Sequence, residues 1–462
     1  MTKLFSLCRI EDQLKTVEVE VSLTPGLPSI QVLGLPDQHL KESAARIKSA
    51  LRAQGFEFPQ ARGILVNLRP SHFRKTSKGL ELAIAAGVLR ETGQMEFSSE
   101  NSIFYGELSL YGDVGQPEDL EDFSGDGSLV VTTGKTKFPI YGMNLLSIET
   151  LRDLEQPKPI LGETHWPYQR PQFGLDFQFP KYQGRFLEIA AVGGFHVMLA
   201  GPSGSGKTTI GQFLHTLSTE FTWEDIRRSG PGARPAWNEQ KWRPLVRPHH
   251  TTPTASLLGG GSHPWMGEVA KSNGGVLLMD EFLEFAPAFQ EALREPMEEQ
   301  KIRISRSGKY REFPFRSQIV ATTNLCPCGD WTPEKIVRCR YSIRKCQSTL
   351  SRLSGPVVDR FEMLAFMKSA PLEPRISGES ILEGVERCRI WISENPKRDL
   401  SAQNLLILLP STMASQRRRK STLRVARAIA DLDKSLEIQR KHLLEALEYT
   451  FFPFEKLKTG FP

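Results

Sequence analysis

Short apolar runs alternate with amphipathic stretches along the middle of the chain, and this pattern predicts buried strands connected by helices. Three such runs cover residues 195–200, 275–279 and 318–323. Behind the first run, Ile210, Phe213 and Leu217 recur at helical spacing. Uninterrupted apolar strands are typical of a parallel sheet covered on both faces, so we expect an α/β domain here.

The two ends of the chain have different patterns. Strand-like alternation at 17–23 and 64–68 flanks a helical stretch over 40–54, whereas helical patterns such as 423–436 dominate after residue 369. A stretch rich in Pro and Gly lacks periodicity and is typical of a linker. The expected segments are an N-terminal α+β domain at 1–150, a linker at 151–173, the α/β domain at 174–368 and a small helical domain at 369–462.

A glycine-rich loop lies between the first apolar strand and its helix. It comprises Gly201, Pro202, Ser203, Gly204, Ser205, Gly206, Lys207, Thr208 and Thr209. The glycines allow backbone conformations that aim N–H groups at phosphate oxygens, and the helix N-terminus adds unpaired donors. Lys207 would reach the β- and γ-phosphates, and the Thr208 hydroxyl would coordinate Mg²⁺. The loop therefore predicts binding of ATP with Mg²⁺.

The other two apolar strands end in polar side chains. Asp280 and Glu281 follow the second strand, and Asn324 follows the third. A carboxylate here can hold Mg²⁺, which is the role expected of Asp280, and Glu281 can polarise the attacking water. Asn324 can orient that water or sense the γ-phosphate, with a plain turn residue as the alternative. This set favours hydrolysis over simple nucleotide binding.

Composition narrows the class of protein. Apolar content of 39% and aromatic content of 9% are ordinary for a globular chain. No apolar run approaches the roughly 20 residues that span a bilayer, so no membrane partner is expected. Acidic residues at Glu11 and Asp12 come too early for a secretory signal, and six cysteines do not resemble an extracellular disulfide framework. We expect a cytoplasmic protein, and the net charge of +6 leans modestly toward an anionic partner.

Two segments concentrate that positive charge. Residues 301–316 carry six basic residues against one acid, and their alternation around Ser307 and Gly308 predicts a β-hairpin. Residues 227–250 carry another six basic residues, interleaved with Trp237 and Trp242. Basic groups track phosphates and aromatic rings stack on bases, so both segments favour DNA, with a solvated basic face as the alternative. The candidate DNA contacts in the hairpin are Arg303, Arg306, Lys309 and Arg311.

Four cysteines cluster within 21 residues: Cys326, Cys328, Cys339 and Cys346. Thiolates at such spacing can satisfy the tetrahedral preference of Zn²⁺, and a bound metal would rigidify a loop that is too small for a core of its own. Free cysteines in a reducing compartment are the alternative.

The sequence resembles the bacterial magnesium-chelatase-like AAA+ ATPases of the ComM/YifB type, a group associated with natural competence. Matching segments are Gly34-Leu-Pro-Asp37, Lys41-Glu-Ser43, Val66-Asn-Leu68, Gly106-Glu-Leu108, Arg247-Pro-His-His250, Gly259-Gly-Gly-Ser262, Gly267-Glu268, Glu291-Ala-Leu-Arg-Glu-Pro296, Cys326-Pro-Cys-Gly329, Arg352-Leu-Ser-Gly-Pro356, Asp359-Arg360 and Leu423-Arg-Val-Ala-Arg427. The resemblance implies a hexameric homo-oligomer acting on single-stranded or branched DNA as a helicase in branch migration. It also implies that the C-terminal helical domain is the lid of the ATPase.

The resemblance also supplies roles for two arginines. Arg360 sits where related ATPases place an arginine finger that acts on nucleotide bound by the neighbouring subunit. Arg424 matches a second sensor arginine that contacts nucleotide from the lid. Both are treated as catalytic candidates together with Glu281 and Asn324. An arginine finger acting in trans makes assembly a requirement for catalysis.

Two competing functions remain open. The N-terminal block resembles the proteolytic domain of Lon-type proteases, but Gly79 falls on the nucleophile position, and no lysine occurs from residue 111 to 134 where the partner is expected. A scaffold or partner-binding role is favoured over proteolysis. The second alternative is an ATPase that remodels a protein partner, as magnesium-chelatase motors do. The basic hairpin favours DNA over this alternative.

Overall fold

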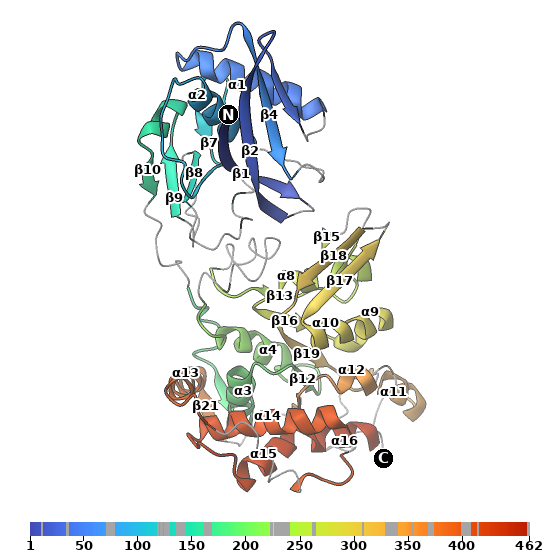
Figure 1. Ribbon diagram of the computed structural model, residues 1–462. Helices are drawn as coiled ribbons and strands as arrows, with labels where there is room; N and C mark the ends of the chain where they lie inside the picture. Colours follow the sequence, from blue (N-terminus) through green and yellow to red (C-terminus); the bar gives the residue numbers. More distant parts are fainter. Residues whose placement is uncertain are drawn as a thin grey trace. The chain divides into compact units, whose positions relative to one another are not determined.

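The apolar runs in the middle of the chain form parallel strands in the computed structural model (Figure 1). Five strands pair in the order β13-β16-β19-β12-β20, and every neighbouring pair is parallel. Their bounds are β12 Val197–Ala200, β13 Leu245–Val246, β16 Val276–Met279, β19 Gln318–Thr323 and β20 Met363–Phe366. The predicted α/β character of this segment is confirmed.

The structure describes residues 1–10, 13–33, 37–70, 79–117, 120, 123, 130–134, 144–160, 169–221, 225, 241–260, 265–306, 309–328, 341–350, 352, 355–367, 374–398, 408–413 and 415–459. The chain divides into two compact units, Met1–Trp166 and Pro167–Pro462. The predicted linker at 151–173 begins too early. Its first residues form the 3₁₀ helix η2 (Leu151–Glu155) and the strand β10 (Lys158–Ile160) of the first unit.

The first unit is built on an eight-stranded mixed sheet with the order β10-β9-β8-β5-β1-β2-β4-β3. The remaining bounds are β1 Thr2–Ile10, β2 Gln13–Pro25, β3 Ile30–Leu33, β4 Arg62–Arg69, β5 Ser102–Phe104, β8 Val130–Gly134 and β9 Asn144–Ile148. A small ribbon of β6 (Glu107–Leu108) and β7 (Val114–Gly115) accompanies the sheet. Helices α1 (Asp37–Ala53) and α2 (Leu80–Glu91) complete the core. This is an α+β arrangement, and its likeness to Lon-type proteases stays a prediction.

Polar packing in the first unit centres on one buried carboxylate, that of Glu81, which is 3% exposed. Its oxygens accept from the Ser43 hydroxyl at 3.1 Å and from the Leu108 backbone N–H at 3.0 Å, and Arg46 lies 3.1 Å away. Burial raises the pKa of Glu81, and these three partners oppose that rise. Two of the sequence segments singled out above, Lys41-Glu-Ser43 and Gly106-Glu-Leu108, therefore meet at this residue and hold α1, α2 and β6 together.

In the second unit, alternate side chains of the parallel strands pack on opposite faces of the sheet, as the strand period of two requires. Val197 and Leu199 join the core with α3 (Lys181–Gly193) and α4 (Lys207–Thr216). Met198 joins the other core. That core also contains residues of α7 Thr254–Leu258, α8 Glu268–Lys271, η3 Phe282–Glu284, α9 Pro287–Ala292, α12 Gly355–Val358 and the hairpin β17–β18. Helices α10 (Arg294–Glu299) and α11 (Ile343–Leu350) complete this part.

Two antiparallel hairpins extend from this unit. The predicted hairpin forms from β17 (Lys301–Arg306) and β18 (Lys309–Pro314), with Arg306 opposite Lys309 at its end, so that prediction is confirmed. The other pairs β14 (Gly259–Gly260) with β15 (Trp265–Met266). Figure 1 shows β15, β17 and β18 together at one end of the second unit, whereas α14, α15 and α16 lie at the other end.

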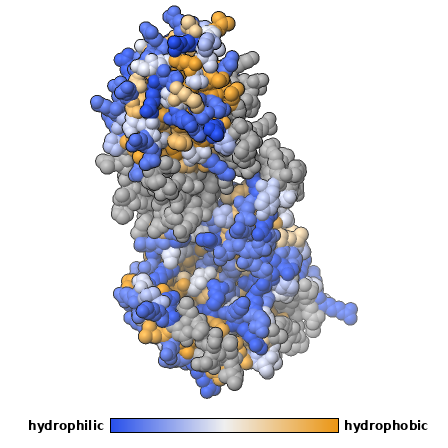
Figure 2. All heavy atoms as spheres, viewed as in Figure 1, coloured by the Kyte–Doolittle hydropathy of each residue, from blue (hydrophilic) through white to orange (hydrophobic). Residues whose placement is uncertain are grey.

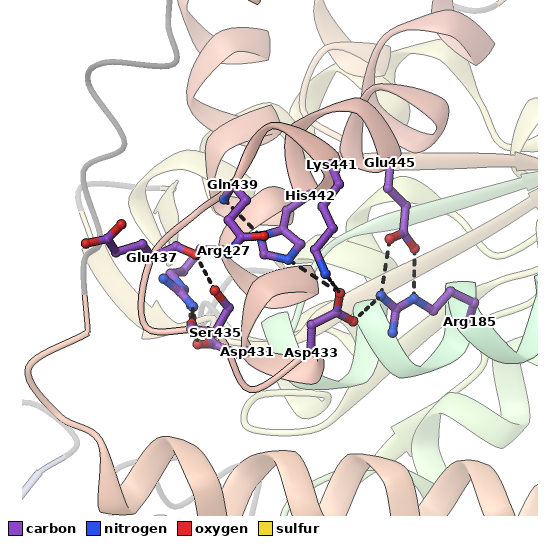
Figure 3. A network of polar contacts seen from close by, with 10 residues as sticks. All are labelled: Arg185, Arg427, Asp431, Asp433, Ser435, Glu437, Gln439, Lys441, His442 and Glu445. Atoms are coloured by element: carbon purple, nitrogen blue, oxygen red, sulfur yellow. Dashed lines mark hydrogen bonds and ion pairs between the residues drawn. The ribbon is translucent and has the colours of Figure 1, made fainter.

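The C-terminal segment is helical, with α13 Gly378–Glu394, α14 Gln416–Leu432, α15 Arg440–Thr450 and α16 Phe452–Thr459. A short ribbon of β11 (Gln178–Pro180) and β21 (Arg375–Ser377) joins its beginning to the start of the α/β segment. Figure 3 shows Arg185 of α3 between the carboxylates of Glu445, 2.7 Å away, and Asp433, 3.0 Å away. These contacts fasten the C-terminal helices to α3, which leads into β12. The role of a lid stays a prediction.

The visible face of the second unit carries mostly hydrophilic side chains in its described part (Figure 2). Among the residues that the structure describes, no helix combines the length and the apolar character that crossing a bilayer requires.

Candidate functional site

The glycine-rich loop connects the buried strand β12 to α4, as predicted. Gly206 immediately precedes α4 and, like Gly204, has a positive φ, +84° and +74° respectively, a region that glycine enters without strain. At Gly201 the reason for glycine is space, because an added Cβ would lie 2.8 Å from the backbone oxygen of Met367. The Ser205 hydroxyl donates to the Pro202 oxygen at 2.7 Å and tightens the turn. The loop thus has the backbone shape that a phosphate cradle requires.

Lys207 is the charged centre of this loop, and it is 8% exposed. Its Nζ donates to three oxygens: Gly201 O at 2.9 Å, Pro202 O at 2.6 Å and Asn324 Oδ1 at 3.0 Å. Burial lowers the pKa of Lys207, and the nearby Asp280 and Glu281 oppose that change. A largely buried ammonium held by neutral oxygens is a fitting counter-ion for a phosphate chain. The structure therefore brings Lys207 and Asn324 together as the sequence suggested.

Thr208 and Asp280 form an oxygen cluster next to the lysine. The Thr208 hydroxyl donates to both carboxylate oxygens of Asp280, at 3.0 and 3.1 Å. The hydroxyl of Thr322, from β19, also donates to Asp280 Oδ1. Hydroxyl and carboxylate oxygens are the ligands that Mg²⁺ takes beside nucleotide phosphates, so the donor set fits this ion. Thr322 was not among the predicted site residues, and its position just before the strand end at Asn324 was the available signal.

Glu281 projects from the end of β16 with an unusual backbone. Its φ is +54°, a left-handed conformation that is uncommon outside glycine, and its N–H donates to Thr322 Oγ1 at 3.2 Å. Its side chain is 55% exposed, and His250 Nδ1 lies 3.6 Å from Glu281 Oε2. The ring of His250 in turn packs against His249, with centroids 4.3 Å apart. The Glu281 carboxylate is therefore open to water and lies beside the imidazole of His250. The sequence had placed His250 only in a basic segment.

The predicted arginine finger lies away from the phosphate loop of its own chain. Arg360 precedes β20, at the amino end of the parallel strands, whereas the loop follows the carboxyl end of β12. Its side chain is 7% exposed and pairs with Glu298 of α10. Its Nε donates to the Arg294 oxygen at 3.3 Å, and another guanidinium nitrogen donates to the Pro356 oxygen.

A second arginine that the sequence reasoning missed, Arg417, also binds Glu298. It belongs to the first turn of α14, which is anchored beside Arg360: the Ser415 hydroxyl donates to Asp359 at 2.8 Å, and Arg418 donates to the Phe361 oxygen at 2.8 Å. Cations are unfavourable at a helix N-terminus because they face the positive end of the helix dipole. The run Arg417-Arg418-Arg419-Lys420 in that first turn was therefore a readable signal for an anionic partner.

Arg424, the predicted second sensor, is not brought to the same place as Arg360. It pairs with Glu362 at 2.7 Å and lies over the ring of Phe195 at 5.3 Å. Glu362 in turn accepts from the His196 N–H at 2.9 Å, just before β12 begins. Arg424 therefore also lies at the amino end of the strands, and it does not contact the phosphate loop of its own chain. The prediction that it reaches nucleotide as part of a covering lid finds no support within one subunit.

The basic hairpin is less available than its composition suggested. Arg303 is paired with Glu299 at 2.5 Å and Glu295 at 3.0 Å, so its charge is already neutralised. Lys301 pairs with Glu312 at 2.6 Å. Tyr310 is 60% exposed and remains open for stacking. Of the four candidate DNA contacts, Arg303 is thus tied to its own subunit, whereas Arg306, Lys309 and Arg311 stay predictions.

In the described part of the second basic segment, Trp242 and Arg243 are structural, whereas Lys241 and Arg247 are exposed. Trp242 is fully buried and donates to the His215 oxygen at 3.3 Å, and Arg170 lies over its ring. Arg243 donates to the backbone oxygens of Thr219 at 2.7 Å and Gly274 at 2.8 Å. These two residues anchor the segment and do not offer a surface to DNA. Residues 226–240, including Trp237, lie outside the described residues.

The cysteine cluster is only partly described. The Sγ atoms of Cys326 and Cys328 lie 3.0 Å apart, and Cys326 is buried. Cys339 lies outside the described residues, as does the side chain of Cys346. Within the described part of the chain, no group of three or more His, Cys, Asp or Glu side chains is arranged to hold a metal ion. The structure therefore gives no support to the predicted zinc site.

Gly79, which falls on the position of the protease nucleophile, is surrounded too closely to carry a side chain. A Cβ added at Gly79 would lie 2.6 Å from the ring of Tyr105 and 2.7 Å from Pro117, so no side chain fits there without rearrangement. The neighbouring Ser77 and Lys78 lie outside the described residues.

Comparison with known proteins agrees with this geometry. Three family models match the chain: "Magnesium chelatase, subunit ChlI" over residues 178–374, "Subunit ChlI of Mg-chelatase" over 19–122 and "Magnesium chelatase, subunit ChlI C-terminal" over 396–450. The first match includes the phosphate loop, both strand-end carboxylates and Arg360. A family of AAA+ proteins of this kind points to an ATPase that uses ATP and Mg²⁺.

Individual relatives match over most of their length. The chain is 29% identical to YifB of Escherichia coli over 94% of both chains, and 29% identical to the competence protein ComM of Haemophilus influenzae over 95% of both. It is 31% identical to Rv2897c of Mycobacterium tuberculosis over 75% of this chain and 73% of that one. The chain therefore belongs to the magnesium-chelatase family of AAA+ proteins that includes YifB and ComM.

Proposed function

We propose that the protein is an ATP-hydrolysing ring motor that acts on DNA, as a helicase in branch migration during recombination or natural transformation. The observation that carries the ATPase part is the convergence of Lys207, Asn324, Thr208 and Asp280 within hydrogen-bonding distance at the end of one sheet. The start of α4, which follows β12, and the ends of β16 and β19 supply these groups, so the fold itself holds them in place.

Each group at this edge has a distinct task in the proposal. The loop N–H groups and Lys207 bind and orient the phosphates, and Thr208 with Asp280 would hold Mg²⁺. The bound ion would supply charge neutralisation of the phosphates. Glu281, open to water and fixed by its left-handed backbone, accepts the proton of the attacking water. Asn324 positions that water or the γ-phosphate. Thr322 keeps the Asp280 carboxylate turned toward Thr208.

Assembly completes the site in this proposal. Arg360 acts on nucleotide bound by the neighbouring subunit, where it stabilises charge in the transition state. In this proposal the second arginine role, predicted for Arg424, is given to Arg417, and its contact with the same Glu298 that binds Arg360 supports that choice. A closed ring of identical subunits, proposed as a hexamer, gives every site a finger.

The DNA part of the proposal rests on the hairpin end and on one relative. Arg306 and Lys309 occupy the last paired position of β17–β18, beyond the position of Arg303, which the glutamates of α10 neutralise. Backbone contacts from such a hairpin are independent of base sequence, as a motor requires. The name of the relative ComM, a competence protein, favours DNA as the ligand.

A second candidate function is remodelling of a protein partner. All three matching family models describe a subunit of magnesium chelatase, and this observation favours it. One experiment separates the candidates: the ATPase rate of the purified full chain with no DNA and with single-stranded, duplex or branched DNA. We expect ATP hydrolysis stimulated by single-stranded or branched DNA. ATPase activity indifferent to all three DNAs would favour the protein-remodelling function.

A further inference from the structure

One carboxylate on α10, that of Glu298, binds two arginines from two other parts of the fold. Oε1 of Glu298 contacts Arg360, just before β20, and Arg417, in the first turn of α14. The side chain of Glu298 is 38% exposed and that of Arg417 is 41% exposed, so this cluster opens to solvent. Two guanidinium groups therefore share a single carboxylate oxygen as their acceptor.

The finger itself is folded into its own subunit. The side chain of Arg360 is 7% exposed, and two of its other donors bind the backbone oxygens of Arg294 and Pro356. Glu298 and Arg360 both line a cavity whose other walls include Arg294, Glu295 and Arg303. In this arrangement the guanidinium cannot extend to another chain without giving up its contact with Glu298.

We propose that Glu298 is a latch that retains Arg360 and Arg417 in the unassembled subunit and releases them to the nucleotide phosphates of the neighbouring subunit. The inference rests on the proposed function, because it assigns the ligand of these arginines to nucleotide bound in trans. A carboxylate carries one negative charge, whereas a nucleotide phosphate chain carries several and accepts bidentate hydrogen bonds from arginine. The phosphate therefore wins the competition once a loaded neighbour docks, and an empty neighbour leaves the latch closed.

If Glu298 is a latch, removing its charge should promote assembly. The loss of a simple structural ion pair would have the opposite effect. Glu298→Gln removes the competing charge while keeping the shape of the side chain and an acceptor oxygen. The arginines then transfer to the neighbour more readily. We expect the protein concentration that gives half-maximal ATPase activity to fall by about threefold, the size typical of losing one partly exposed ion pair. Nucleotide binding to the dilute, unassembled chain should stay unchanged.

The matched control is Glu295→Gln, on the same helix, since Glu295 pairs with Arg303 and not with Arg360. This variant should not change the protein concentration that gives half-maximal ATPase activity. The triple variant that adds Glu298→Gln to Arg360→Ala and Arg417→Ala tests the mechanism, because without the arginines the Glu298 change should have no further effect on assembly. Melting curves of all variants verify that each one folds.

Three outcomes would overturn the latch. A rise in the half-maximal concentration, or a fall in the maximal rate, on Glu298→Gln would show that Glu298 positions the arginines for catalysis instead of withholding them. An unchanged half-maximal concentration would show a passive surface pair. Failure of the proposed function looks different: the wild-type chain would then hydrolyse ATP at a rate per subunit that is independent of protein concentration, or would not hydrolyse it at all.

Discussion

The two edges of the same parallel sheet differ in how complete they are within one chain. At the carboxyl edge, Lys207, Thr208, Asp280 and Asn324 are already joined by hydrogen bonds, and their arrangement needs nothing from outside except the nucleotide and its ion. At the amino edge, cationic side chains are paired with carboxylates of their own subunit, Arg360 with Glu298 and Arg424 with Glu362.

In the proposed ring, this difference would divide one reaction between two chains. The edge that binds nucleotide gains from being preorganised, because orienting its donors in advance lowers the cost of binding. At the other edge Arg360 is held on a carboxylate of its own subunit, from which we propose that the nucleotide of a neighbour releases it. Variants that disrupt one edge of the sheet and leave the other intact test the two roles separately.

The largest effect is expected from the carboxyl edge. Lys207→Ala should abolish nucleotide binding, because the phosphates lose their main side-chain counter-ion. Glu281→Gln should keep binding yet stop turnover, because an amide cannot accept the proton of water. Equilibrium binding of a fluorescent ATP analogue and steady-state hydrolysis separate the two variants. Turnover at the wild-type rate in Glu281→Gln would contradict the role given to this carboxylate.

Breaking the amino edge should leave binding intact. Arg360→Ala is expected to bind ATP normally and to lose hydrolysis by about 10³-fold or more, the size seen when an arginine finger is removed. Mixing it with Lys207→Ala chains should restore part of the activity, because one kind of interface then has both an intact loop and an intact finger. The hydrolysis rate of mixtures at a series of ratios measures this.

The mixing experiment has its own control. Each variant alone at the same total concentration gives the baseline, and native mass spectrometry shows whether mixed rings form. Mixed rings without any recovered activity would mean that Arg360 acts within its own chain or not at all.

The carboxyl edge could be predicted almost completely from the sequence. Gly201, Lys207 and Thr208 stand in a contiguous motif, and Asp280 and Asn324 end apolar runs that had to be neighbouring strands. The strand order then placed them together without further knowledge, because carboxyl ends of parallel strands share an edge. Thr322 escaped, since a threonine inside a strand has no distinctive pattern until its neighbour Asp280 is placed beside it. His250, beside Glu281, escaped as well, because the sequence placed it only in a basic segment.

The amino edge could not be predicted in the same way. Its residues come from α10, α12 and α14, far apart in the sequence, and no motif joins them. Helix α14 carries several arginines, and spacing alone does not show which of them faces the sheet edge. The hydrogen bond from Ser415 to Asp359 anchors the start of α14, and Arg417, not Arg424, lies beside Arg360. For the hairpin, composition showed the basic residues but not the glutamates of α10 that neutralise Arg303.

A smaller effect sharpens the assignment at the amino edge. Arg417→Ala should reduce hydrolysis by roughly 10- to 100-fold, the range expected when one charge-assisted hydrogen bond to a phosphate is removed. Arg424→Ala should reduce it by only about threefold, because it loses an ion pair that is 59% exposed on the arginine side. Maximal rates measured at saturating ATP and protein provide the test. A larger reduction for Arg424→Ala than for Arg417→Ala would return the sensor role to Arg424.

The smallest expected effect concerns DNA and leaves both edges untouched. If the end of the β17–β18 hairpin follows a DNA backbone, replacing Arg306 and Lys309 together by Ala should weaken DNA binding irrespective of base sequence. It should also lower the slope of log affinity against log salt by about 0.7 to 0.9 for each phosphate that the hairpin no longer neutralises. Basal ATPase activity without DNA should persist, since the proposed nucleotide site is built from other residues.

Arg303→Ala is the matched comparison within the same hairpin. Arg303 is held by Glu295 and Glu299, so its removal should change the salt slope little, although all three residues contribute one positive charge. Fluorescence anisotropy with single-stranded DNA at several salt concentrations measures both variants. A change for Arg303→Ala about half as large as that of the double variant, which removes twice the charge, would mean that overall charge, not the hairpin end, attracts DNA. An unchanged slope in both variants would mean that the basic residues of β17–β18 neutralise no DNA phosphate. The hairpin would then be a solvated basic face, and protein remodelling would be the favoured function.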